Sequence, residues 1–97
     1  VRNPWVGINL DSGNFHSADP YADVARCVPY AVNVQVKVEI RRRGGQPEAT
    51  DLDRLVGILR AGGYQGWVAL EYEAAEDPHT AVPRHLKELR ERFRSPA

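Results

Sequence analysis

The chain has 97 residues, of which 13 are basic and 13 acidic, so its formal net charge at pH 7 is zero. This balance argues against a protein that binds the phosphate backbone of nucleic acids, because such proteins carry an excess of Lys and Arg. The length leaves room for one small domain. No apolar run approaches the roughly 20 residues of a membrane-spanning helix, and the first residues do not form a signal peptide, so we expect a cytoplasmic protein that does not enter a membrane.

Strand-like and helix-like segments alternate along the chain, and this order predicts a parallel sheet. The first strand is expected near residues 5–11. A loop follows, and a helix should begin at Asp19, with Pro20 at the first helical position, where its missing N–H costs nothing. The second strand, near residues 31–39, has a valine at every second position through Val38, which is typical of pleated strands.

The second half of the chain continues the alternation. A basic loop that contains glycine is expected over residues 41–48, and the next helix should begin at Thr50, with Asp53 as its capping partner. The third strand is expected near residues 67–73, and a C-terminal helix follows it. The sequence therefore predicts an α/β protein of three βα units.

Each predicted strand has one apolar face and one face that becomes polar toward its carboxyl end. Because residues two apart on a strand share a face, the polar side chains of three parallel strands should gather at one end of the sheet. These side chains are Asp11, Gln35, Lys37, Glu39, Glu71 and Glu73. A sheet covered by helices on both faces would be almost continuously apolar, whereas the inner face of a (β/α)₈ barrel opens into an active site at this rim. The pattern favours a partial (β/α)₈ TIM barrel, and the alternative is a water-exposed sheet face without function.

Carboxylates and amides that converge at one rim have two common uses. Their oxygens can hold a divalent cation, since hard metals prefer oxygen ligands. They can also supply acids and bases that move a proton next to a carbonyl, with a metal acting as Lewis acid. The spacing does not separate these two uses.

Three segments resemble those of a known family. Residues 8–16, followed by Asp19 and Pro20, resemble the strand end "LDTGN/H" of xylose isomerase-like barrels, a family of sugar-phosphate isomerases, ketose 3-epimerases and, more distantly, zinc-dependent apurinic endonucleases. Residues 32–37 are similar to the next strand, "VHVHVKD", and residues 63–73 look like the closing strand, "GYxGxxxxEY". The matches occur in order and imply that residues 1–97 are the C-terminal portion of such a barrel, with its last three strands.

The resemblance also implies a metal site made from strand ends. By position, Asp11 is the aspartate ligand, Glu71 is the closing glutamate ligand, and Gln35 stands where the family has a histidine ligand. The neutral amide oxygen of Gln35 disfavours Zn²⁺ and favours Mg²⁺ or Mn²⁺. Asn14 also stands where relatives often carry a histidine. The loss of both histidines disfavours a multi-zinc endonuclease.

In the epimerases of this family two glutamates also form the acid–base pair, and the resemblance implies that Glu71 is the catalytic one in this chain. Its partner would lie on an upstream strand that these residues do not include. The candidate contacts to a sugar or sugar phosphate are Asn14, His16, Lys37 and Arg41. We therefore expect a fragment of a metal-dependent sugar (phosphate) isomerase or epimerase, inactive by itself.

A non-catalytic module that self-associates, or that binds a ligand weakly, is the alternative from a different class. Three strands of a barrel leave two open sheet edges, and open edges are templates for further pairing. Parity also places Trp5 and Trp67 on the inner face, which an intact barrel would bury. We expect a second copy, or the remainder of a longer chain, to cover these features. We also expect the chain alone to bind divalent metal weakly or not at all.

Overall fold

The computed structural model of the protein describes residues 3 and 5–94. Within them, a three-stranded parallel sheet has the strand order β1-β2-β5, so the predicted βαβαβα order is confirmed. The strands of this sheet are β1 (Ile8–Asp11), β2 (Ala31–Lys37) and β5 (Val68–Glu71). The helices are α1 (Pro20–Cys27), the short 3₁₀ helix η1 (Val28–Tyr30), α2 (Leu52–Ala61) and α3 (Pro78–Arg94).

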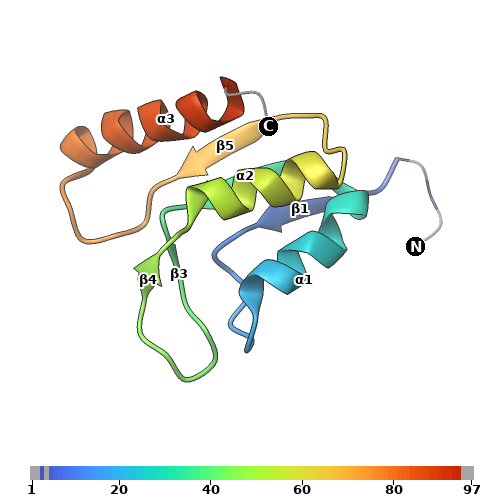
Figure 1. Cartoon of the computed structure of the whole chain (residues 1–97), viewed down its shortest axis with the longest axis horizontal. Coiled ribbons are helices and arrows are strands. Elements are labelled where there is room, and N and C mark those ends of the chain that lie inside the picture. The colour runs from blue at the N-terminus through green and yellow to red at the C-terminus, as the bar shows by residue number, and fades with distance from the viewer. Residues whose placement is uncertain (1–2, 4, 95–97) are drawn as a thin grey trace.

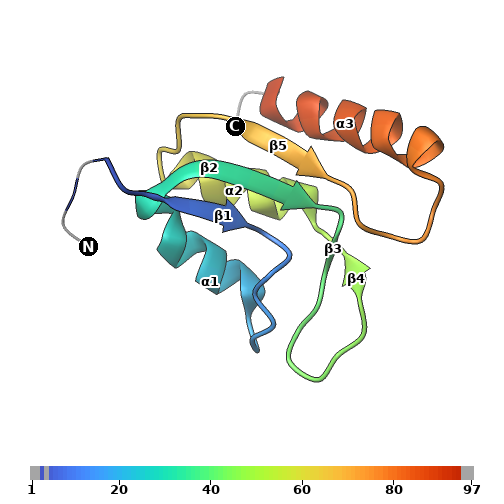
Figure 2. The ribbon, with the colours of Figure 1, turned by 180° about the vertical axis from the view of Figure 1, so that it is seen from behind.

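The three α-helices cover one face of the sheet and leave the other face open. Figure 1 shows α1 and α2 in front of β1 and β2, with α3 alongside β5, and Figure 2 shows the sheet from the uncovered side. The covered face forms the core: Leu10, Val34 and Val36 are at most 1% exposed. They pack with buried side chains of all three helices, such as Val24, Leu55, Leu59 and Leu89. The opposite face carries the polar residues that the alternation predicted.

The register brings the strand ends together. Asp11 pairs with Gln35 across β1 and β2, and Lys37 pairs with Glu71 across β2 and β5. Asp11, Lys37 and Glu71 are therefore the last residues of three adjacent parallel strands. Because paired residues of neighbouring strands point to the same face, their charged side chains meet at one rim.

The strands are shorter than predicted, and the second strand does not continue to residue 39 as a member of the sheet. The chain bends at Val38, and β3 (Glu39–Ile40) pairs instead with β4 (Glu48–Ala49) in an antiparallel hairpin. Residues 41–48, which were predicted as a loop, therefore connect β3 to β4, and the last of them, Glu48, is the first residue of β4. Apolar alternation continues through Val38 and Ile40 because both side chains are buried, although Val38 lies at the bend and Ile40 belongs to β3.

At the start of the second strand, the prediction that the alternating valines face the helices was also wrong. Val32 is 63% exposed, and Ile8 on the neighbouring strand is exposed as well. The pairing also slips between Ile8 and Asn9, and Ile8 and Val32 lie outside the packed core, whereas Ala31 packs against it. Period-two spacing identifies the two faces of a strand, but it does not tell how far the covering helices reach.

One of the two predicted helix starts is confirmed. Asp19 caps α1 by accepting a hydrogen bond from the Ala22 N–H at 3.2 Å, with Pro20 first in the helix. The prediction that Thr50 begins the second helix was wrong, because Asp51 is the cap and accepts from the Arg54 N–H at 3.1 Å. Thr50 is held by the preceding strand instead: its hydroxyl donates to the Lys37 carbonyl at 2.7 Å.

Candidate active site at the carboxyl ends of the strands

Lys37 is at the centre of the polar rim. Its ammonium lies 3.3 Å from Asp11 Oδ2 and 3.7 Å from Glu73 Oε2, and it donates a hydrogen bond to Asn14 Oδ1 at 2.8 Å. Burial alone would lower the pKa of Lys37, but the nearby carboxylates outweigh burial and raise the pKa above its ordinary value. The side chain is therefore a fixed ammonium at neutral pH, and it is only 15% exposed.

The loop after β1 is shaped around this ammonium. The Gly13 N–H donates to Asp11 Oδ1 at 2.9 Å, which orients the carboxylate toward the rim. Ser12 is buried, and its hydroxyl accepts a hydrogen bond from the Lys37 N–H at 3.0 Å. A Cβ on Gly13 would lie 2.5 Å from Lys37 Cδ, so only glycine lets the lysine cross the loop. Sequence reasoning did not assign roles to Ser12 and Gly13, although Gly13 follows the aspartate within the quoted family motif.

Gln35 belongs to an amide ladder on the open face of the sheet. Its Oε1 accepts a hydrogen bond from Asn9 Nδ2 at 3.3 Å, and Asn9 Oδ1 accepts from Asn33 Nδ2 at 2.9 Å. Glu71 differs from these residues, because its Oε2 atom is buried without a hydrogen-bond partner among the described residues. A buried carboxylate oxygen without a donor is unusual in a folded protein, and a catalytic role or a bound water or ion is among the explanations for one.

A cavity of about 310 Å³ opens beside Lys37. Its walls include all four predicted substrate contacts, namely Asn14, His16, Lys37 and Arg41. The β1–α1 loop supplies Asn14 and His16, and the hairpin that follows β2 supplies Arg41. Glu39 and Glu73 also line the cavity, so cationic and anionic side chains face the same space. The structure thus brings together residues that lie as far apart as positions 14 and 73 in the sequence.

Comparison with protein families agrees with this geometry. A model of the xylose isomerase-like TIM barrel family matches residues 1–92. The chain belongs to this family. Among curated proteins, none matches it. The predicted family is therefore confirmed, and the parallel sheet with helices on one face agrees with the predicted partial barrel.

The metal ligands expected for this xylose isomerase-like chain do not fit a divalent cation in the observed arrangement. Both oxygens of Asp11 are engaged, one by the Gly13 N–H and the other by the Lys37 ammonium, and the amide oxygen of Gln35 is engaged by Asn9. Only Glu71 presents an oxygen without a donor. Within residues 3 and 5–94, no three His, Cys, Asp or Glu side chains are grouped to hold a metal ion.

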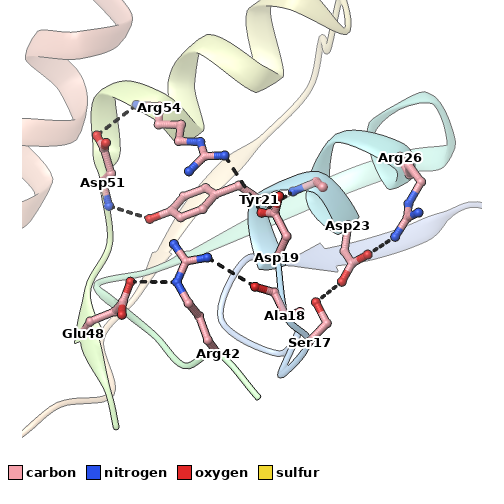
Figure 3. Close-up of polar contacts among 11 residues, drawn as sticks. Ser17, Ala18, Asp19, Tyr21, Asp23, Arg26, Arg42, Glu48, Asp51 and Arg54 are labelled. Atoms are coloured by element: carbon pink, nitrogen blue, oxygen red, sulfur yellow. Dashed lines mark hydrogen bonds and ion pairs between the residues drawn. The ribbon is translucent and has the colours of Figure 1, made fainter. Parts of the chain in front are cut away.

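The hairpin wall of the cavity is anchored to α1 and α2 through Tyr21, as Figure 3 shows. The Tyr21 hydroxyl accepts from the Asp51 N–H at 2.9 Å, and the Arg54 guanidinium lies 4.3 Å from the ring centroid. Arg42 belongs to the hairpin. Its guanidinium carbon lies 5.9 Å from the centroid of the same ring, and its Nε atom lies 3.4 Å from Glu48 Oε1. Nothing in the sequence pattern distinguished Tyr21 from other helix residues, because its partners are distant in the chain.

The base of the β1–α1 loop is fixed by a separate polar group. Asp23 accepts from the Ser17 hydroxyl and pairs with Arg26, and the Arg43 N–H donates to the Ser17 carbonyl at 2.9 Å. The pKa of Asp23 is lowered, chiefly by the hydrogen bond from Ser17 and also by Arg26. The loop and the hairpin on either side of the cavity are thus tied to each other.

None of the helices formed by the described residues is both long enough and apolar enough to cross a bilayer.

Proposed function

We propose that this chain supplies the substrate-binding and proton-transferring part of a sugar isomerase or epimerase. One observation carries the proposal: Asn14, His16, Lys37 and Arg41 line a single cavity at the strand ends, where barrels of this family have their active sites. The substrate would be a sugar or sugar phosphate, whose hydroxyl groups match the amide, imidazole and ammonium groups in the wall. A volume near 300 Å³ suits a small-molecule ligand.

Glu71 is the proposed acid–base residue. In an aldose–ketose interconversion or an epimerisation, the carbon next to a carbonyl loses a proton, and the electrons of the C–H bond pass to the carbonyl oxygen as an enediolate forms. Glu71 is not among the residues that line the cavity, but it is the register partner of Lys37, which does line it. The Glu71 carboxylate, one oxygen of which has no hydrogen-bond partner among the described residues, would accept that proton. Its register partner Lys37 would donate a hydrogen bond to the oxygen that becomes negative. In an isomerisation the proton would return to the neighbouring carbon, while the hydroxyl proton passes to the oxygen that was the carbonyl. In an epimerisation a second acid, the partner glutamate expected on an upstream strand, would return a proton to the same carbon from the opposite face.

The charges around the cavity support a proposed position for each substrate group. Lys37 is already paired with Asp11 and Glu73, whereas Arg41 is exposed on the hairpin wall. A phosphate group, where the substrate has one, would therefore bind to Arg41, and the sugar hydroxyls would bind to Asn14 and Lys37. Guanidinium groups suit phosphate because they donate two parallel hydrogen bonds.

Binding can be tested on the chain by ¹H–¹⁵N NMR during titration with D-fructose and with fructose phosphate. The expected result is that amide shifts concentrate at Asn14, Lys37 and Arg41. Arg41→Ala should weaken the phosphate ester more than the free sugar, whereas Arg90→Ala on the exposed face of α3 should change neither. Shifts confined to α3, or equal effects of both variants, would contradict the assignment of the cavity.

Proton transfer requires a second measurement, on the natural protein. In D₂O, a sugar isomerase or epimerase incorporates deuterium at the carbon next to the carbonyl. Glu71→Gln should reduce this exchange by about a hundredfold or more while leaving sugar binding in place. Unchanged exchange in the variant would remove Glu71 from the mechanism.

A second candidate function is self-association without catalysis, which the exposed tryptophans favour. Trp5 is 93% exposed and Trp67 is 83% exposed. Strands β1 and β5 each have one open edge in the sheet formed by the described residues. A second copy could pair its β1 with the open edge of β5 and cover these rings. Sedimentation equilibrium distinguishes the cases: this candidate predicts dimers or larger species whose dissociation increases when Trp67 is changed to Ser, and a monomer at all concentrations would exclude it.

A further inference from the structure

The three strands of the sheet each end in a charged residue, and the middle one is a cation. Lys37 on β2 lies between Asp11 on β1 and Glu71 on β5, and Glu73 beyond β5 faces it from the same side. Its ammonium is within 4 Å of two carboxylates and donates to Asn14 Oδ1. The strand-end carboxylates of this site are thus already gathered around one positive charge.

Lys37 is held in this position along its whole length. Its N–H is bound by the Ser12 hydroxyl and its carbonyl by the Thr50 hydroxyl, so the backbone at the strand end is fixed from both neighbouring loops. Its methylene groups pass directly over Gly13, where a larger residue would clash. A side chain with a fixed backbone, a closely fitted stem and a paired head is preorganised rather than free to swing away.

We propose that the ammonium of Lys37, and not a divalent metal, is the resident cation of this site. A metal bound to Asp11 would have to lie beside the Lys37 ammonium, which is 3.3 Å from Asp11 Oδ2. Two positive charges so close together repel strongly in a partly buried setting. The metal would also have to share the Asp11 carboxylate with the Gly13 N–H and with Lys37. In the reaction, the ammonium supplies the positive charge opposite the developing negative oxygen. This inference deepens the proposed function, on which its catalytic part rests.

Lysine content makes the inference directly testable, because Lys37 and Lys87 are the only lysines in the chain. Lys87 is exposed on α3 and serves as a matched control. Calorimetric titration with Mn²⁺ should show weak binding to the wild-type chain and to Lys87→Met. Lys37→Met should bind Mn²⁺ roughly tenfold more tightly or better, because the site gains a unit of negative charge and frees Asp11. Adding Asp11→Asn to Lys37→Met should return binding to the wild-type level.

A second measurement on folded wild-type protein guards against a variant that does not fold. In ¹H–¹⁵N spectra of lysine ammonium groups, Lys37 should give a slowly exchanging signal at low temperature and Lys87 should not. That signal should be lost in Asp11→Asn and kept in Glu48→Gln, which alters a carboxylate away from Lys37. Mn²⁺ binding to the wild type as tight as to Lys37→Met would overturn the inference. Equal ammonium exchange at the two lysines would overturn it as well.

These outcomes are separable from those of the proposed function. If sugar still shifts the amides of the cavity while Mn²⁺ displaces Lys37, only the resident-cation inference falls. If the Lys37 ammonium is protected and metal is excluded but neither sugar nor sugar phosphate binds, the proposed function falls and the resident cation remains.

Discussion

Lys37 and Gly13 lie in direct contact at the rim, with the lysine stem filling the space that a side chain at position 13 would need. A Cβ on Gly13 would approach Lys37 Cδ to 2.5 Å and Lys37 Cβ to 2.9 Å. The end of the stem can move, but Lys37 Cβ is fixed by the strand backbone. The glycine is therefore required by the position of the lysine, not by backbone conformation, since its φ is not positive.

Gly13→Ala should destabilise the chain by about 1–3 kcal/mol, the usual cost of overpacking. It should also separate the ammonium from Asp11. Gly57→Ala is the matched control: Gly57 is an exposed residue in the middle of α2 with nothing within 4 Å of its added Cβ. That change should instead stabilise by roughly 0.5–1 kcal/mol through helix propensity. Urea unfolding of both variants measures the difference, and effects of the same sign would contradict the contact.

Tyr21→Phe tests the anchor of the hairpin wall. The change keeps the ring that packs against Arg54 but leaves the Asp51 N–H without its acceptor. We expect a loss of about 1–2 kcal/mol in the free energy of unfolding. Tyr30→Phe is the control, because Tyr30 is 68% exposed and should tolerate the loss of its hydroxyl. Equal stability of the two variants would mean that the Tyr21 hydroxyl does not hold the start of α2.

The start of α3 should make the chain sensitive to acid. Arg84 donates to both oxygens of Glu76, at 2.6 and 2.8 Å, and these hydrogen bonds hold the pKa of Glu76 below its ordinary value. A carboxyl group with a lowered folded-state pKa stabilises the fold above its unfolded pKa, near 4.3, and the contribution is lost as pH falls through the folded value. Thermal unfolding of wild type and Glu76→Gln should differ most at neutral pH and converge near pH 3. A constant difference at all pH values would contradict this linkage.

The sequence was sufficient for the order of elements and for the gathering of polar side chains. Period-two alternation placed Asp11, Gln35 and Glu71 on one face, and parallel pairing then brought them to one rim. It could not reveal that Lys37 occupies the space between the carboxylates, because that depends on how closely the loop at Gly13 passes the strand. Alternation indicates the face on which a side chain lies and says nothing of the atom it meets.

The hairpin was missed for a related reason. Apolar spacing continues from Val36 through Val38 to Ile40, and all three side chains are buried, so the pattern alone reads as one long strand. The bend at Val38 is stabilised by Thr50, whose N–H donates to the Val38 carbonyl at 2.8 Å. Thr50 is thus bonded to a residue 12 positions earlier, and Asp51, not Thr50, is the N-cap of α2.

Asp51→Ala tests this corrected helix start. The Asp51 carboxylate accepts from the Arg54 N–H, and its removal leaves a first-turn donor without a partner, so we expect a loss of about 1 kcal/mol in the free energy of unfolding. The comparison is Asp53→Ala, which removes the residue predicted as the capping partner. The Asp53 side chain is 80% exposed and lies 3.0 Å from Arg92, and exposed pairs of this kind contribute roughly 0–1 kcal/mol. The Asp51 backbone N–H remains bound to Tyr21 in both variants, so the difference between them isolates the cap. A larger loss for Asp53→Ala than for Asp51→Ala would show that the helix is capped as the sequence first suggested.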